Sequence, residues 1–159
     1  MEKQVKANAY AYALFDNLFL TPEELKKVQS NSIERCFFKE LKEFPESNLM
    51  HFYTLASDWV FIVRSFKADI IGNSEDVNTF LKNLPMIGLL NPKTEVEILS
   101  LSCSAVNQIY LDEVFLPLTP NQIPEELIGY LKIKNVSYIP EKPIRICVQL
   151  IGYLEKQTK

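Results

Sequence analysis

The chain has few of the residues that catalytic and cofactor-binding motifs require. It contains four glycines and a single histidine among 159 residues. No glycine-rich phosphate loop occurs, so we do not expect a nucleotide bound through such a loop. The histidine, His51, could act on a nucleophile such as Ser57 or Cys103, but neither lies in a nucleophile-elbow sequence. We therefore expect His51 to be an ordinary hydrogen-bonded side chain rather than a catalytic base.

Cysteine is also scarce, and the three cysteines are far apart in the sequence. Cys36, Cys103 and Cys147 are each surrounded by apolar residues, and no two of them have the short spacing of zinc ligands. This pattern favours buried, reduced thiols over disulfides, and a reducing cytoplasm as the compartment. We predict no structural metal and no cofactor.

Long apolar segments are missing as well. The first residues lack the apolar core of a signal peptide, and no apolar run approaches the roughly 20 residues that span a bilayer. We therefore expect no association with a membrane. The hydrophobic content of 47% and the length suit one buried core. We predict a single domain over residues 1–154, followed by a polar tail at 155–159.

Charge is unevenly distributed along the chain. The net charge is −3, but residues 132–159 carry six basic and two acidic side chains. The net charge of residues 1–131 is therefore negative. The candidate binding residues in this basic segment are Lys132, Lys134, Lys142 and Arg145. The simplest interpretation is a polar surface strand and a solvated tail. The alternative is a docking site for an acidic surface, either protein or nucleic acid.

The first half of the sequence favours helices. Residues 7–20 fit both strand alternation and helical spacing, and their alanines favour a helix. A helix start follows at Thr21-Pro22-Glu23-Glu24, where Thr21 can cap and Pro22 suits the first turn. We predict a long helix from there to Pro45. Its expected apolar stripe consists of Ile33, Phe37, Leu41 and Phe44.

The second half favours strands. Residues 49–55 and 59–66 predict a hairpin, and a short helix is expected from Ser74. Residues 94–118, the longest run of strand-forming residues, predict paired strands at the centre of a sheet. A short helix is expected from Pro124 to about residue 131, and strands at 133–139 and 144–154. The pentapeptide Leu-Ile-Gly-Tyr-Leu thus occurs once in the predicted helix, at 127–131, and once in a predicted strand, at 150–154.

These elements predict a single α+β domain, with a mainly antiparallel sheet of five or six strands covered by N-terminal helices. The abundance of aromatic residues, at 11%, and the absence of catalytic motifs favour a non-catalytic protein-interaction module of binding, adaptor or inhibitor type. It would act through an aromatic and aliphatic surface on a protein partner or on a second copy of itself.

Two other functions remain open from the sequence. The first is a carboxylate-dependent hydrolase using Glu95, Glu97, Asp112 and Glu113, of which the first two share one face of a strand. The second is nucleic-acid binding through the basic C-terminal strands, where tyrosines accompany the lysines.

Overall fold

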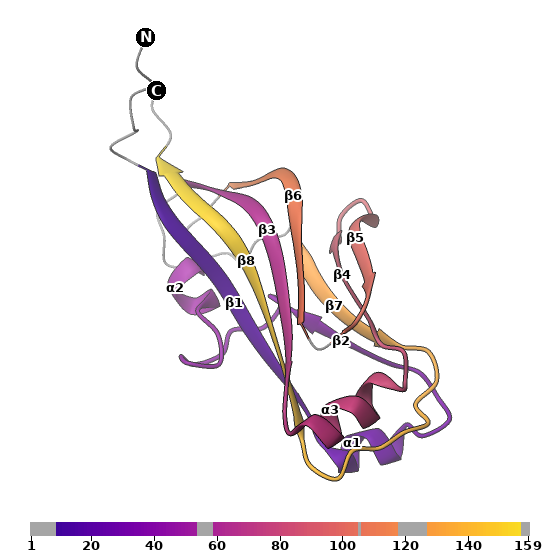
Figure 1. Ribbon diagram of the computed structural model, residues 1–159. Helices are drawn as coiled ribbons and strands as arrows, with labels where there is room; N and C mark the ends of the chain where they lie inside the picture. Colours follow the sequence, from indigo (N-terminus) through magenta and orange to yellow (C-terminus); the bar gives the residue numbers. More distant parts are fainter. Residues whose placement is uncertain (1–8, 54–58, 105, 118–126, 157–159) are drawn as a thin grey trace.

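The computed structural model describes residues 9–53, 59–104, 106–117 and 127–156, and it is built mainly of strands (Figure 1). This part of the chain is 58% strand and 13% helix. The elements in chain order are β1 (Ala9–Leu20), α1 (Pro22–Lys27), β2 (Ile33–Phe37), α2 (Leu49–Tyr53), β3 (Trp59–Ile71), α3 (Ser74–Leu81), β4 (Met86–Asn91), β5 (Val96–Ser102), β6 (Val106–Pro117), β7 (Ile128–Ile133) and β8 (Ile144–Lys156).

The eight strands form two four-stranded antiparallel sheets. One sheet has the order β1-β8-β3-β6 and the other has the order β2-β7-β4-β5. β1 pairs with β8, β2 with β7, β3 with β6, and β4 with β5. These pairs are those of one long hairpin in which β4 and β5 form the closed end. Rolling this hairpin up adds the contacts of β8 with β3 and of β7 with β4. This connectivity defines an eight-stranded jelly roll.

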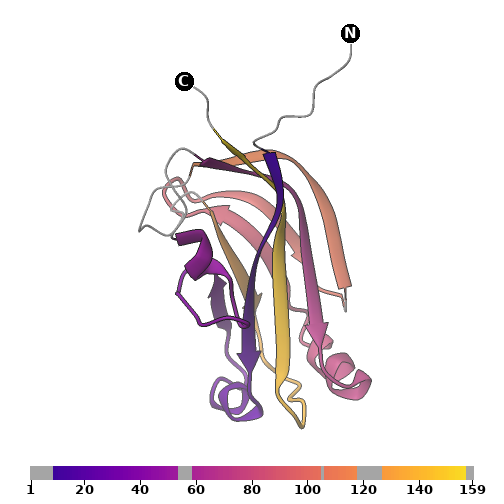
Figure 2. The same cartoon turned by 90° about the vertical axis from the view of Figure 1, so that its left-hand side faces the viewer.

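Figure 2 shows the β1-β8-β3-β6 sheet in front of the other sheet, and the buried core side chains come from both sheets. Strand alternation explains which residues enter the core, because successive side chains point to opposite faces. In β8 the side chains of Ile144, Ile146, Val148 and Leu150 are buried, whereas Arg145 between them is exposed. Phe61 and Phe66 of β3 are also fully buried on this inner side. The outer face of each sheet is therefore formed by the alternate residues.

The predicted α+β fold, with a five- or six-stranded sheet covered by helices, is wrong. The described residues contain only three short helices, and residues 9–20 form strand β1 rather than a helix. All twelve residues of β1 pair with β8. Backbone hydrogen bonding along this ladder and burial of Leu14 and Leu20 outweigh the helix propensity of the alanines, which is below 1 kcal/mol per residue.

The long helix is also wrong beyond its first turns. Thr21 caps α1 by accepting a hydrogen bond from the Glu24 N–H, at 3.1 Å, as predicted, but the helix ends at Lys27. Ile33 and Phe37 then lie on β2, and both are buried. A separation of four residues places two side chains on one face of a strand as well as on one face of a helix. The remaining members of the stripe, Leu41 and Phe44, are exposed.

Several predictions for the second half also change. Residues 49–53 form α2 instead of a strand, and the predicted turn at 56–58 lies outside the described residues. Strands β5 and β6 occur within residues 94–118, but they belong to different sheets and lie at their edges. Residues 128–131 belong to strand β7, which ends at Ile133, and not to a helix. The strand at 144–154 is confirmed and continues to Lys156.

A buried carboxylate connects β1 to the segment that follows β2. Asp16 is buried and accepts hydrogen bonds from the Phe38 N–H at 2.8 Å and from the Lys42 ammonium at 2.9 Å. Burial nevertheless raises the pKa of Asp16, and the hydrogen bonds from Phe38 and Lys42 offset only part of this effect. The folded protein therefore binds a proton at this site more tightly than the unfolded chain does.

We expect Asp16 to make the protein less stable as the pH rises from about 4, the ordinary pKa of aspartate, through the raised pKa of the folded state. Urea melts of the wild type and of Asp16→Asn across this range measure the effect. The stability of the wild type relative to the variant should fall as the pH rises, and a relative stability that increases with pH would contradict the shift.

Candidate functional site

The four carboxylates proposed for hydrolysis do not come together. Glu97 lies on β5 and contacts Tyr130, whereas Glu113 lies on β6 in the other sheet and contacts Arg64 and Tyr153. Asp112 is exposed beside Glu113, and Glu95 is exposed in the turn between β4 and β5. Within the described ranges, no three His, Cys, Asp or Glu side chains are grouped so as to hold a metal ion.

The four basic candidates lie on β7, on the connection between β7 and β8, and on β8. Lys132 is on β7 and Lys134 follows it, so these two lie at one site. Lys142 is in the connection that leads to β8, and Arg145 is on the outer face of the β1-β8-β3-β6 sheet. Lys132 and Arg145 therefore lie on the outer faces of different sheets.

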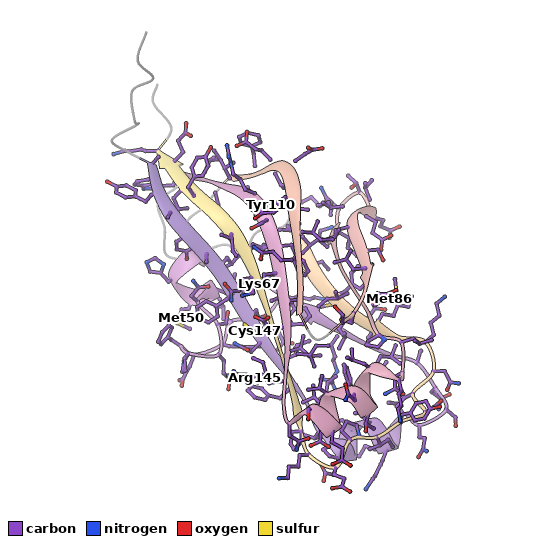
Figure 3. The ribbon with its side chains drawn as sticks, in the orientation of Figure 1. Met50, Lys67, Met86, Tyr110, Arg145 and Cys147 are labelled. Atoms are coloured by element: carbon purple, nitrogen blue, oxygen red, sulfur yellow. The ribbon has the colours of Figure 1, made fainter. Side chains whose placement is uncertain are left out.

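None of the helices that the structure describes covers the outer face of the β1-β8-β3-β6 sheet. In Figure 1 this sheet faces the viewer, and the three helices lie at its margins. Figure 3 labels Tyr110, Lys67, Cys147 and Arg145 along this side. None of the described helices is long and apolar enough to cross a membrane.

Strand register places a group of aromatic and aliphatic residues on this side. One row across the sheet is Ala11, Tyr153, Ile62 and Phe115, and the next is Ala13, Ile151, Ser65 and Tyr110. Tyr110 is 83% exposed and Phe115 is 57% exposed, both on the edge strand β6. We call these two rows, together with the neighbouring Arg64 and Glu113, the aromatic face.

Polar contacts hold the side chains of the aromatic face in place. The Arg64 guanidinium donates to the Glu113 carboxylate at 2.8 Å and lies 5.2 Å from the centre of the Tyr153 ring. The Tyr153 hydroxyl donates to the same carboxylate at 3.2 Å. An arginine stacked on an aromatic ring and paired with a carboxylate is a common arrangement at protein interfaces.

A second feature, a pocket of about 270 Å³, lies on the outer face of the β2-β7-β4-β5 sheet. We call it the β4–β7 pocket. It is lined by Glu34, Met86, Leu90, Glu97, Ser100, Tyr130, Lys132 and Lys134. Its volume is just below the range of about 300 to 1,000 Å³ that is usual for small-molecule sites.

Tyr130 and Gly88 explain how this pocket forms. The two residues are neighbours across β7 and β4, and the Tyr130 ring lies over the glycine. A Cβ atom at Gly88 would be 2.6 Å from the Tyr130 hydroxyl, so only glycine leaves room for this ring position. The Tyr130 hydroxyl is hydrogen bonded to the Glu97 carboxylate and lies 3.2 Å from the Ser100 hydroxyl. Burial and, to a lesser degree, the contact with Glu97 raise the pKa of Tyr130, which therefore stays protonated.

Sequence reasoning found Lys132, Lys134 and Glu97 but missed the rest of this pocket. Met86, Leu90 and Tyr130 have no recognisable motif around them. The one available signal was Gly88 within an apolar run, because a glycine inside a strand often marks a close approach by another group.

Comparisons with known proteins give no family. No protein-family model matches the chain, and no curated protein matches it. Among solved structures, the decameric BFDV capsid protein matches with a TM-score of 0.37 at 7% identity. The match covers 94% of this chain and 99% of the capsid protein chain. A chain of black queen cell virus has a TM-score of 0.41 at 4% identity, with 93% of this chain and 70% of that chain covered. Likenesses this weak are no basis for inference, so the class of the fold rests on the strand order alone.

Proposed function

We propose that this jelly roll is a non-catalytic protein-interaction domain whose contact surface is the aromatic face. The partner we propose is a second copy of the chain. The observation that carries the proposal is the exposure of Tyr110 and Phe115 on the outer face of a four-stranded sheet. Large aromatic side chains exposed on one face of a sheet are an unfavourable surface in water unless another molecule covers them.

The composition of the aromatic face supports a protein partner. Protein interfaces are enriched in tyrosine, phenylalanine and arginine, and their energetically dominant residues come from the same group. The aromatic face contains Tyr110, Tyr153 and Phe115 within two adjacent rows of the sheet, and Arg64 lies beside these rows. The only carboxylate of this group, Glu113, is already paired with Arg64.

The size of the sheet face also fits. Four strands about 4.8 Å apart and strands of 12 or 13 residues give an outer face of roughly 20 Å by 40 Å. This corresponds to ~800 Å², which is the area that one partner contributes to a protein interface of standard size.

The charges of this side are compatible with self-association. Lys67 and Asp69 form an ion pair at 3.9 Å, and Arg64 pairs with Glu113. Charges of both signs therefore alternate on the sheet, although the whole chain carries −3. When two copies meet through this face, the contact therefore contains charges of both signs. A symmetric arrangement can place a positive side chain of one copy opposite a negative side chain of the other.

The test is sedimentation velocity of the purified protein over a wide range of concentrations. We expect the wild type to form dimers or larger assemblies as concentration rises. Tyr110→Ser combined with Phe115→Ser should weaken the association at least about tenfold, because truncated central aromatics commonly cost more than 1 kcal/mol of binding. The matched control is Tyr138→Ser, which removes an exposed tyrosine located after β7.

Each outcome of this experiment bears on the proposal. A wild type that remains monomeric at all concentrations contradicts self-association. Association that persists unchanged in the double variant, or that is lost equally in Tyr138→Ser, contradicts the aromatic face as the contact surface.

A further inference from the structure

The β4–β7 pocket is on the sheet opposite to the aromatic face, so the proposed protein contact leaves it free. Its side chains form rows across the strands. The first row places Glu34 beside Lys132 and Met86. The second contains Tyr130, Gly88 and Ser100, and the third contains Leu90 and Glu97. The pocket therefore has two chemically different ends, which lie along the direction of β4.

The end at the first row has two lysines and one glutamate, Glu34, so its net charge is positive. Lys132 and Lys134 both line the pocket and are both exposed. Neither lysine has a hydrogen-bond or ion-pair partner among the residues that the structure describes. Lys132 on β7 and Lys134 just after it line the same pocket, so their ammonium groups can both donate to one carboxylate or phosphate.

The opposite end accepts hydrogen bonds. The Tyr130 hydroxyl is hydrogen bonded to the Glu97 carboxylate. Tyr130 is buried, and its ring is oriented by its position over Gly88. A carboxylate has about four sites at which it accepts hydrogen bonds, and Tyr130 occupies one of them. The Ser100 hydroxyl lies beside it. This end therefore suits an amine or another strong donor.

The segment between the two ends is apolar. Met86 and Leu90 lie on the pocket-lining side of β4, on either side of Gly88. They are four residues apart, which corresponds to about 13 Å along a strand. The side chains of Lys132 and Glu97 extend over part of this length. A ligand with a short aliphatic chain would span the remainder.

We propose that the β4–β7 pocket binds a small elongated zwitterion, with an acid at one end, an amine at the other and an aliphatic spacer between them. The acid lies at Lys132 and Lys134, the amine at Glu97 and Ser100, and the spacer along Met86 and Leu90. The chemistry is that of an ω-amino acid. Because the two ends carry opposite charges, a ligand that lacks either charged group loses one set of contacts.

The experiment is a titration with ε-aminocaproate, caproate and n-hexylamine, followed by amide chemical shifts or calorimetry. We expect saturable binding of ε-aminocaproate, with caproate and n-hexylamine at least tenfold weaker. Lys132→Met combined with Lys134→Met should abolish the advantage of ε-aminocaproate over n-hexylamine, because the acid loses its partners. Glu97→Gln should instead abolish its advantage over caproate.

Lys142→Met is the matched control, because it removes a lysine located outside the pocket. Circular dichroism establishes that each variant is folded. The proposal is overturned if ε-aminocaproate shows no saturable binding to the folded wild type. It is also overturned if caproate or n-hexylamine binds equally well, or if Lys142→Met weakens binding as much as the pocket variants do.

Discussion

Phe37→Ala is expected to lower the free energy of unfolding by about 3 to 5 kcal/mol, the usual effect of removing a buried aromatic side chain. Phe37 is fully buried at the end of β2, opposite Gly129 of β7. A Cβ atom at Gly129 would lie only 3.0 Å from the Phe37 Cβ, so the two strands are in close contact here. Truncation therefore leaves a cavity that the sheet cannot easily close. Urea melts of the purified variant measure the loss.

Phe44→Ala is the matched control for this prediction. Phe44 was assigned by helical spacing to the same buried stripe as Phe37, but it is 77% exposed. We expect its truncation to cost less than about 1 kcal/mol, as is usual for an exposed site. Equal losses for Phe37→Ala and Phe44→Ala would support a helix over these residues and contradict strand β2.

Gly152→Ala is the second large effect that we expect. Gly152 pairs with Val63 of β3 next to the irregularity in the register between Val63 and Ser65. A Cβ atom at Gly152 would lie 1.8 Å from the carbonyl oxygen of Ile62, so the backbone of β3 has to move. Strain of this kind costs about 1 to 3 kcal/mol and occasionally more, and we expect the upper part of that range because the obstacle is backbone. Thermal or urea melts measure it.

Gly72→Ala is the control for the glycine prediction. A Cβ atom there would lie 3.2 Å from the Cδ1 of Ile144, which is the end of a flexible side chain. We expect a loss of no more than about 1 kcal/mol. A similar cost at both glycines would mean that β3 and β8 do not approach each other as closely as the structure shows.

Local signals in the sequence predicted the parts of the fold that depend on neighbouring residues. The cap at Thr21 and the short helix beginning at Ser74 are both present. Ile33 and Phe37 were correctly expected to be buried, but their spacing of four residues fits both helix and strand. Which of the two forms is decided by the pairing of β2 with β7, roughly a hundred residues later in the chain.

The repeated pentapeptide shows the same limit. The second copy of Leu-Ile-Gly-Tyr-Leu, residues 150–154, lies in β8, and the first lies in β7 from its second residue onward, at 128–131. The earlier prediction of a helix for the first copy followed from the proline and glutamates before it, which are locally favourable for a helix start. Pairing with β2 and β4 outweighs that preference.

The candidate sites were less predictable than the elements. The residues of the β4–β7 pocket come from β2, β4, β5 and β7, and its neighbours, such as Tyr130 and Gly88, are about forty residues apart. The aromatic face combines side chains of β3, β6 and β8 in the same way. The sequence predicted an aromatic and aliphatic contact surface in general terms, but no periodicity within a single strand shows which rows of different strands will be adjacent.

The most direct test of the central claim, a jelly roll that associates through its aromatic face, is a dilution series followed by amide chemical shifts. With increasing concentration, we expect shifts and broadening at residues 62–67 of β3, 108–115 of β6 and 149–153 of β8, and little change on β2, β4, β5 and β7. Spectra that are independent of concentration, or changes confined to the β2-β7-β4-β5 sheet, would contradict it.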